Sequence, residues 1–326
     1  MTEETNKSGL FIEILVPIFA VLLALLVSDI LILIYNESPL KVYKILLEGT
    51  VLNPYGLGQV LFKTTPLILS GLAVAFAFRA GLFNIGAEGQ LYIGAFATGL
   101  AGAYLPVGTP AILAIPLCII AGFVAGFIAG VIPGYLKARL GAHEVINTIM
   151  LNFIIIALVN YLVVTYFKVP ETLHTQEIIA SSKINRLFEF IPAFKGSAAN
   201  LSFIAAVILC IAVYIILWKT KFGYDLRAVG FNPSAAETAG INVKKCITLS
   251  LAISGGIAGL IGMNFTLGYK YYFEEGFSSG LGFMGIAVAL LGRNHPFGVI
   301  AAAFLFGILS QDGLVINAVV PKELVD

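Results

Sequence analysis

Charged residues are scarce in this chain. Only 11% of its 326 residues are Asp, Glu, Lys or Arg, whereas 59% are hydrophobic. A soluble domain carries about 25% charged residues, so the composition excludes a soluble protein and predicts an integral membrane protein. The net charge of +1 gives no reason to expect a nucleic-acid partner.

Cysteine and histidine are also rare, with three residues of each. Cys118, Cys210 and Cys246 lie in or beside apolar runs without CxxC spacing, which favours buried thiols over a redox or metal site. The sequence contains no Gly-x-x-x-x-Gly-Lys-Ser/Thr segment, the phosphate loop that many ATP-binding proteins use. We therefore expect no metal, cofactor or catalytic residue in this chain.

Long apolar runs are what the chain has in abundance. They are continuous over roughly twenty residues, the length of a spanning helix, and they lack the alternation that a β-barrel requires. We predict an all-α integral membrane protein with about nine transmembrane helices and one domain over 1–326. The predicted spans are 11–35, 58–78, 89–106, 110–134, 145–167, 200–218, 247–268, 279–292 and 296–312.

Two polar connections separate groups of spans. With an inside N-terminus, which the cluster of five cations between spans six and seven favours, the connection at 219–246 is cytoplasmic and that at 168–199 is extracytoplasmic. The segment 40–47 has the pattern of a short amphipathic helix on the outer surface.

The segment 79–90 interrupts the apolar sequence with Arg79, Asn84, Glu88, Gln90 and three glycines. A charged group inside a bilayer usually faces a pathway or the protein interior. Backbone that is broken at membrane depth is tolerated only where protein or a wet cavity covers it. We therefore predict a broken or re-entrant element here, as is typical of transport proteins.

Two interpretations of Glu88 remain open. Its carboxylate either hydrogen-bonds a substrate or gates the pathway, or it accepts backbone N–H bonds at the start of its own helix, where an anion is favoured. The same two interpretations remain open for Asn84 and Gln90, which either line the pathway or form hydrogen bonds with backbone groups that the break leaves free. Arg79 is predicted to be an inner-face anchor or a partner of Glu88.

The cytoplasmic segment 223–245 has the pattern of a short capped helix. Asn232 is a good N-cap, Pro233 suits the first helical position, and Gly240 supplies a left-handed stop. A helix of about seven residues is not stable alone in water. It is therefore either a docking element seated in a partner's groove or a surface connection between spans six and seven.

The same segment carries a resemblance. Gly-x-x-x-Arg-Ala-x-Gly-x-Asn-x-x-Ala-Ala-x-x-x-Gly-Ile at 223–241 resembles the cytoplasmic coupling loop of ABC importer permeases for branched-chain amino acids, ribose-type sugars and nucleosides. Asn-Ile-Gly-Ala-Glu-Gly-Gln at 84–90 and Leu-Lys-Ala-Arg-x-Gly-Ala-His-Glu-Val-Ile at 136–146 are similar to the branch for nucleosides and simple sugars. The similarity extends through 285–298. Members of this family usually have ten spans, one more than we predict here.

The resemblance implies a permease subunit of an ATP-driven importer, most similar to those for nucleosides such as guanosine. ATP and Mg would be bound by a separate cytoplasmic ATPase. The other implied partners are a second permease subunit, identical or related, a lipid-anchored extracytoplasmic substrate-binding protein, and the lipids of a bacterial-type cell membrane.

Particular residues are predicted to carry these roles. The predicted pathway residues are Asn84, Glu88, Gln90, Asn147 and Asn152, and the predicted ATPase-coupling residues are Arg227, Gly230, Asn232, Ala235, Ala236, Gly240 and Ile241. Glu144 and Asn147, three residues apart on one helix, are predicted to form a polar bridge between helices or a second ATPase contact.

Other functions remain open on the residues alone. The substrate could be a ribose-type sugar or a branched-chain amino acid. An ion-coupled carrier also uses broken helices, often in paired inverted repeats, but only one strong break is present here. A membrane-embedded enzyme would need a metal cluster or an activated nucleophile, and the sequence offers no candidate for either.

Overall fold

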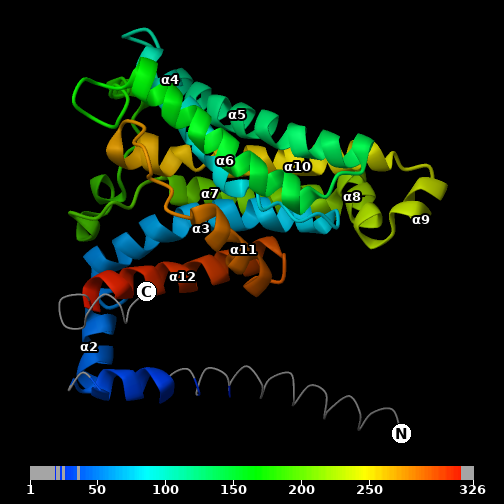
Figure 1. The fold of residues 1–326 in the computed structure, drawn as a ribbon. Coiled ribbons are helices and arrows are strands. Elements are labelled where there is room, and N and C mark those ends of the chain that lie inside the picture. The colour runs from blue at the N-terminus through cyan, green and yellow to red at the C-terminus, as the bar shows by residue number, and fades with distance from the viewer. Residues whose placement is uncertain (1–18, 20–22, 24–25, 35–36, 317–326) are drawn as a thin grey trace, which may run out of the picture.

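The computed structural model describes residues 19, 23, 26–34 and 37–316, which form a bundle of helices (Figure 1). Within these residues no strand forms, although a few isolated bridges do. Six segments are long and apolar enough to cross a membrane, so the prediction of an all-α, multi-pass membrane protein is confirmed. They are α3 (Pro54–Arg79), α5 (Ala111–Leu140), α6 (Glu144–Leu162) with the π-helix η1 (Val163–Phe167), α7 (Ser202–Lys219), α10 (Val243–Gly259) with the π-helix η5 (Met263–Lys270), and α12 (Pro296–Ile316).

Two further helices occupy predicted spans. They are α4 (Ala87–Tyr104), at the predicted run 89–106, and α11 (Leu281–Leu291), at the predicted run 279–292. With 11 residues, α11 is about 16 Å long and too short to cross a bilayer alone. The predicted span 11–35 lies largely outside the described residues. The amphipathic helix predicted at 40–47 is present as α2 (Pro39–Gly49).

Two helices form the centre of the bundle. Of their most apolar 18-residue windows, 89% is buried in α3 and 78% in α10 with η5, against 22% to 28% in α5, α6, α7 and α12. The outer helices therefore present their apolar faces outward, as lipid requires.

Glycines bring α5 against α10. A Cβ at Gly126 would lie 2.2 Å from the carbonyl oxygen of Gly255, and a Cβ at Gly130 would lie 2.2 Å from that of Leu251. Small residues at such positions let two helix backbones approach closely, which is how helices associate in a membrane.

The two long polar connections lie at opposite ends of the bundle (Figure 1). At one end, α8 (Lys221–Phe231) and α9 (Pro233–Thr238) project beyond the spans. At the other end lie the short 3-10 helices η2 (Ala180–Ser182), η3 (Leu187–Glu189) and η4 (Pro192–Phe194). This arrangement fits the prediction that they face opposite sides of the membrane; which side is cytoplasmic stays a prediction.

Candidate functional site

The predicted break is present between α3 and α4. The helix α3 ends at Arg79, Gly81 adopts a left-handed φ of 72°, and α4 begins at Ala87. A glycine suits the turn because it has no Cβ to oppose a positive φ. The residues 80–86 therefore form a non-helical connection in the middle of otherwise helical sequence.

Two amides hold this connection in place. Asn84 Nδ2 donates to Gln90 Oε1 at 2.7 Å and to Ser254 Oγ at 2.8 Å, while Asn84 Oδ1 accepts from Gly86 N at 3.0 Å. Ser254 Oγ in turn donates to the Ala73 carbonyl of α3 at 2.6 Å. These side chains are fully buried and bonded to one another, so in this subunit they join the break to α3 and α10.

A third amide comes from α6. Asn152 Oδ1 accepts from Gly89 N and Asn152 Nδ2 donates to the Ile85 carbonyl, each at 2.8 Å. One side chain thus satisfies a donor and an acceptor that the broken helix leaves free. The structure therefore brings Asn84, Gln90 and Asn152 together, while their role in a pathway stays a prediction.

Glu88 caps a helix other than its own. Its carboxylate accepts from Ser278 Oγ at 2.6 Å, from Gly280 N at 3.1 Å and from Gly282 N at 2.6 Å, all at the start of α11. The sequence interpretation placed the accepted N–H groups at the start of α4. The carboxylate also lies in the first turn of α4, so it faces the positive ends of two helices.

Arg79 is not a partner of Glu88. Its Nε donates to the Asn294 carbonyl at 2.9 Å, its Nη2 donates to the Arg293 carbonyl at 3.3 Å, and its guanidinium lies 4.8 Å from the Trp218 ring centroid. Arg293 and Asn294 follow the C-terminal end of α11, whereas Glu88 caps its N-terminal end. The two side chains therefore contact opposite ends of α11, which is about 16 Å long, and the chain re-enters the bundle between them.

Glu144 and Asn147 do not join this network. Glu144 pairs with Lys137 of α5 at 2.8 Å, which forms the polar bridge between helices that was one of the two predictions. Asn147 is half-buried, and its Nδ2 has no hydrogen-bond partner among the residues described. Among the described residues, Asn147 is thus not bonded to the other four predicted pathway residues.

The predicted capped helix is present as α9. Asn232 Oδ1 accepts from Ala235 N at 3.1 Å, Pro233 occupies the first turn, and Gly240 has a φ of 82°. The Ile241 N–H donates to the Ala236 carbonyl at 3.0 Å and closes the C-terminal end. The prediction of a short capped helix from the sequence pattern is therefore confirmed.

The predicted coupling residues divide into three groups. Ala236 is only 4% exposed and packs with Ile241 against Val229 and Cys246, so these two hold α9 on α8 and α10. Gly230 lies against the start of the break, where a Cβ would lie 2.3 Å from the Arg79 carbonyl oxygen. The Arg227 guanidinium lies 5.9 Å from the ring centroid of Trp218, which Arg79 also contacts.

The third group faces outward, and beside it lies a residue that the sequence interpretation missed. Asn232, Ala235 and Gly240 are exposed, and beside them the side chain of Phe231, the last residue of α8, is 90% exposed. A free aromatic ring on a polar projection is the kind of group that anchors a protein interface. Its position directly before the N-cap of a short helix was the available signal.

Comparisons with known proteins agree with the motifs. Residues 56–325 match the family described as branched-chain amino acid transport system, permease component. The chain is 39% identical to the guanosine ABC transporter permease protein NupP of Bacillus subtilis over 96% of this chain and 90% of that protein. It is 36% identical to the nucleoside ABC transporter permease protein NupB of Lactococcus lactis (96% and 87%), and 33% identical to the glucose ABC transporter permease protein TsgB13 of Haloferax volcanii (95% and 83%). The resemblance drawn from the motifs is confirmed, and the chain belongs to this family of membrane permease components.

Proposed function

We propose that this chain is the membrane permease subunit of an ATP-driven importer of nucleosides such as guanosine. The observation that carries the coupling mechanism is the α8–α9 projection, which carries an exposed Phe231 between its two helices and packs through Gly230 on the end of α3. The substrate class rests on the nucleoside permeases that the chain resembles over almost its full length.

The contacts supply a route for coupling. An ATPase that pulls on α9 moves α8 with it, because Ala236 and Val229 lie in one packed cluster. The helix α8 contacts Arg79 and Gly81 at Gly230, and Gly81 begins the connection that leads to Asn84 and Glu88. A displacement at the projection therefore reaches the re-entrant segment through packed groups, which move between discrete arrangements rather than deforming continuously.

The partners follow from this mechanism. A separate cytoplasmic ATPase binds ATP and Mg and receives the α8–α9 projection. A second permease subunit completes the pathway, and an extracytoplasmic lipoprotein delivers the substrate. The complex is located in the cell membrane.

The test is the ATPase activity of the reconstituted complex: this chain, its neighbouring permease, their ATPase, and the binding protein loaded with guanosine, ribose or leucine. We expect stimulation with guanosine and little with the other two. Stimulation with ribose or leucine instead would show that the substrate is not a nucleoside. A sugar is the alternative that the glucose permease relative favours. If no ATPase assembles with the chain, an ion-coupled carrier becomes the better proposal.

A variant tests the coupling contact separately. Phe231→Ala removes an aromatic group of the size that typically contributes more than 1 kcal/mol at an interface hot spot, so we expect at least a several-fold weaker association of the ATPase. Phe153→Ala is the matched control, because Phe153 is exposed on α6 among apolar neighbours. Equal ATPase binding by both variants would refute the docking role of Phe231.

A further inference from the structure

A cavity of about 300 Å³ lies where α3, η5, α11, α12 and the connection 271–280 meet. It is large enough for a small organic ligand, since ligand pockets begin at about 300 Å³. Its lining combines three phenylalanine rings, three serines and one lysine with aliphatic residues. The residues that carry the argument are Phe62, Phe265, Phe277, Ser278, Ser279 and Lys63. None of the predicted pathway residues lines it.

The three rings form one continuous aromatic wall. The Phe265 ring centroid is 5.4 Å from that of Phe62 and 5.1 Å from that of Phe277. Phe277 also stacks on Tyr92 of α4 at 5.6 Å with an interplanar angle of 14°. The wall is therefore fixed before any ligand arrives, and a flat heteroaromatic ring can stack on it without ordering the side chains first.

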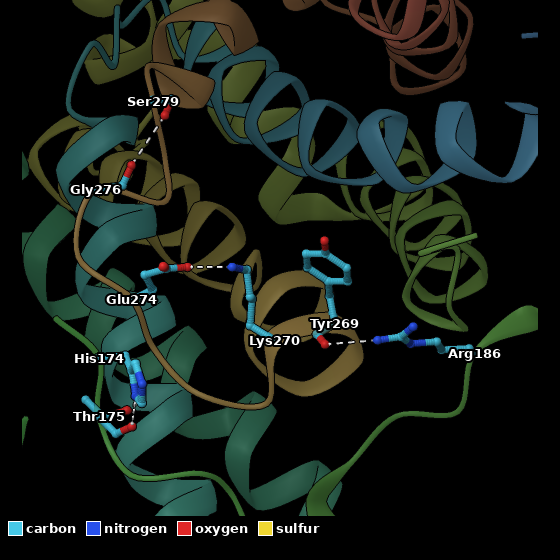
Figure 2. Close-up of polar contacts among 8 residues, drawn as sticks. All are labelled: His174, Thr175, Arg186, Tyr269, Lys270, Glu274, Gly276 and Ser279. Atoms are coloured by element: carbon cyan, nitrogen blue, oxygen red, sulfur yellow. Dashed lines mark hydrogen bonds and ion pairs between the residues drawn. The ribbon is translucent and has the colours of Figure 1, made fainter. Parts of the chain in front are cut away.

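Ser278 and Ser279 supply hydroxyl groups to the same cavity. Ser278 Oγ donates its proton to Glu88 Oε1 at 2.6 Å, so its oxygen can still accept a hydrogen bond. Ser279 is exposed, adopts a left-handed φ of 43° and has its Oγ 3.3 Å from the Gly276 carbonyl (Figure 2). Glu88 thus acts as a positioning residue for this wall of the cavity.

The connection that carries Phe277, Ser278 and Ser279 is held at its start by two contacts. Lys270 pairs with Glu274 at 2.9 Å, and Arg186 Nη2 donates to the Tyr269 carbonyl at 3.2 Å (Figure 2). Non-helical backbone within a membrane protein occurs where it is buried in protein or lines a water-filled cavity. The cavity beside 277–280 satisfies this condition.

The face that holds the cavity is not a lipid face. Lys63 lies nine residues after Pro54, the first residue of α3, which places it about 14 Å along the helix. Its Nζ donates to the Ser310 carbonyl of α12 at 2.6 Å. Charged groups at such depth face another protein surface or an aqueous path.

We infer that this cavity holds the base of a nucleoside during its passage, with the base on the Phe62–Phe265–Phe277 wall and hydroxyl or edge groups bonded to Ser278 and Ser279. The inference rests on the proposed nucleoside import and deepens it. Asn84, Gln90 and Asn152 do not take this role, because their polar atoms are bonded to one another and to the backbone.

The first test is nucleoside uptake by the complete transporter in proteoliposomes. Phe277→Ala should lower the kcat/KM of guanosine uptake about 5- to 150-fold, which is the equivalent of ~1–3 kcal/mol for one base–aromatic stack. Phe277→Tyr keeps the ring and should retain most of the uptake. Phe283→Ala is the matched control, because Phe283 is an exposed residue of α11 outside the cavity. Equal uptake by the two alanine variants would overturn the inference.

The second test does not depend on how well the alanine variant folds. Cys118, Cys210 and Cys246 are all buried, so Ser279→Cys adds the one accessible thiol of the described residues, and a methanethiosulfonate reagent reports on it. We expect guanosine to slow the labelling at least several-fold and ribose to leave it unchanged. Equal protection by ribose, or none by guanosine, would overturn base binding here. If guanosine protects the thiol but a guanosine-loaded binding protein does not stimulate the ATPase, the cavity stands and the proposed import function fails.

Discussion

Replacing Glu88 with glutamine tests what its carboxylate does. The carboxylate accepts from Ser278 Oγ, Gly280 N and Gly282 N. An amide has one acceptor oxygen, and whichever way it is turned its NH₂ group faces Gly280 N–H or Gly282 N–H. One buried backbone donor therefore loses its acceptor, at about 1–3 kcal/mol. The lost charge at two helix N-termini adds about 0.3–2 kcal/mol.

The sum for Glu88→Gln is about 1–5 kcal/mol, and each 1 kcal/mol lowers the Tm of a large domain by ~2–4 °C. We expect the Tm of the purified transporter to fall by on the order of 10 °C, measured by size-exclusion chromatography after heating. Glu177→Gln is the control, because Glu177 is 60% exposed in its ion pair with Lys183 and such pairs contribute about 1 kcal/mol or less. An unchanged Tm with a raised KM for uptake would refute the capping role and favour a direct substrate contact.

Two further substitutions test the packing around the break. Gly126→Val should destabilise the bundle by about 1–3 kcal/mol or more, because a Cβ there would lie 2.2 Å from the Gly255 carbonyl oxygen; a Tm equal to that of Ile128→Leu, on the exposed side of α5, would contradict the close approach. Asn152→Leu leaves Gly89 N and the Ile85 carbonyl unpaired, so we expect a loss of roughly 2–5 kcal/mol, measured as the same Tm. Asn147→Leu, which removes an Nδ2 without a partner in the described part of the chain, should leave the Tm unchanged, and equal losses in both would show that the bonds of Asn152 contribute nothing.

The sequence was sufficient to locate the break and the capped helix because both are local. Gly81, Asn84 and Glu88 stand out against apolar neighbours, since polar groups at membrane depth need partners. Asn232, Pro233 and Gly240 specify a helix start and stop within a few residues. In each case the sequence distance between signal and structure is small.

The partners of these residues could not be read from the sequence. Glu88 accepts from Gly282, which lies 194 positions further along the chain, and no local pattern relates α4 to α11. A similar problem affects Ala236 and Phe231. The face that a short helix turns inward is set by the cluster of Val229 and Cys246 beneath it, not by its own composition.

The cavity was missed for a further reason. Phe62, Phe265 and Phe277 belong to α3, η5 and the connection before α11, and each is one of 24 phenylalanines in an apolar chain. From the sequence alone, a phenylalanine in such a chain is expected to contact lipid or to pack between helices. Only the meeting of three segments distinguishes these rings from the others.

These contacts connect the α8–α9 projection with the cavity beside α11. Gly230 of α8 touches the Arg79 carbonyl, Glu88 follows at the far end of the re-entrant connection, and Ser278 of the cavity wall is bonded to Glu88. Because Arg79 also holds the carbonyls that follow α11, the short helix α11 is fastened at both ends to the segment that the projection contacts. A shift of α8 therefore has to move α11 as a unit or break one of these bonds. If α11 moves as a unit, we expect the volume of the cavity to change, because α11 and the residues that precede it form one of its walls.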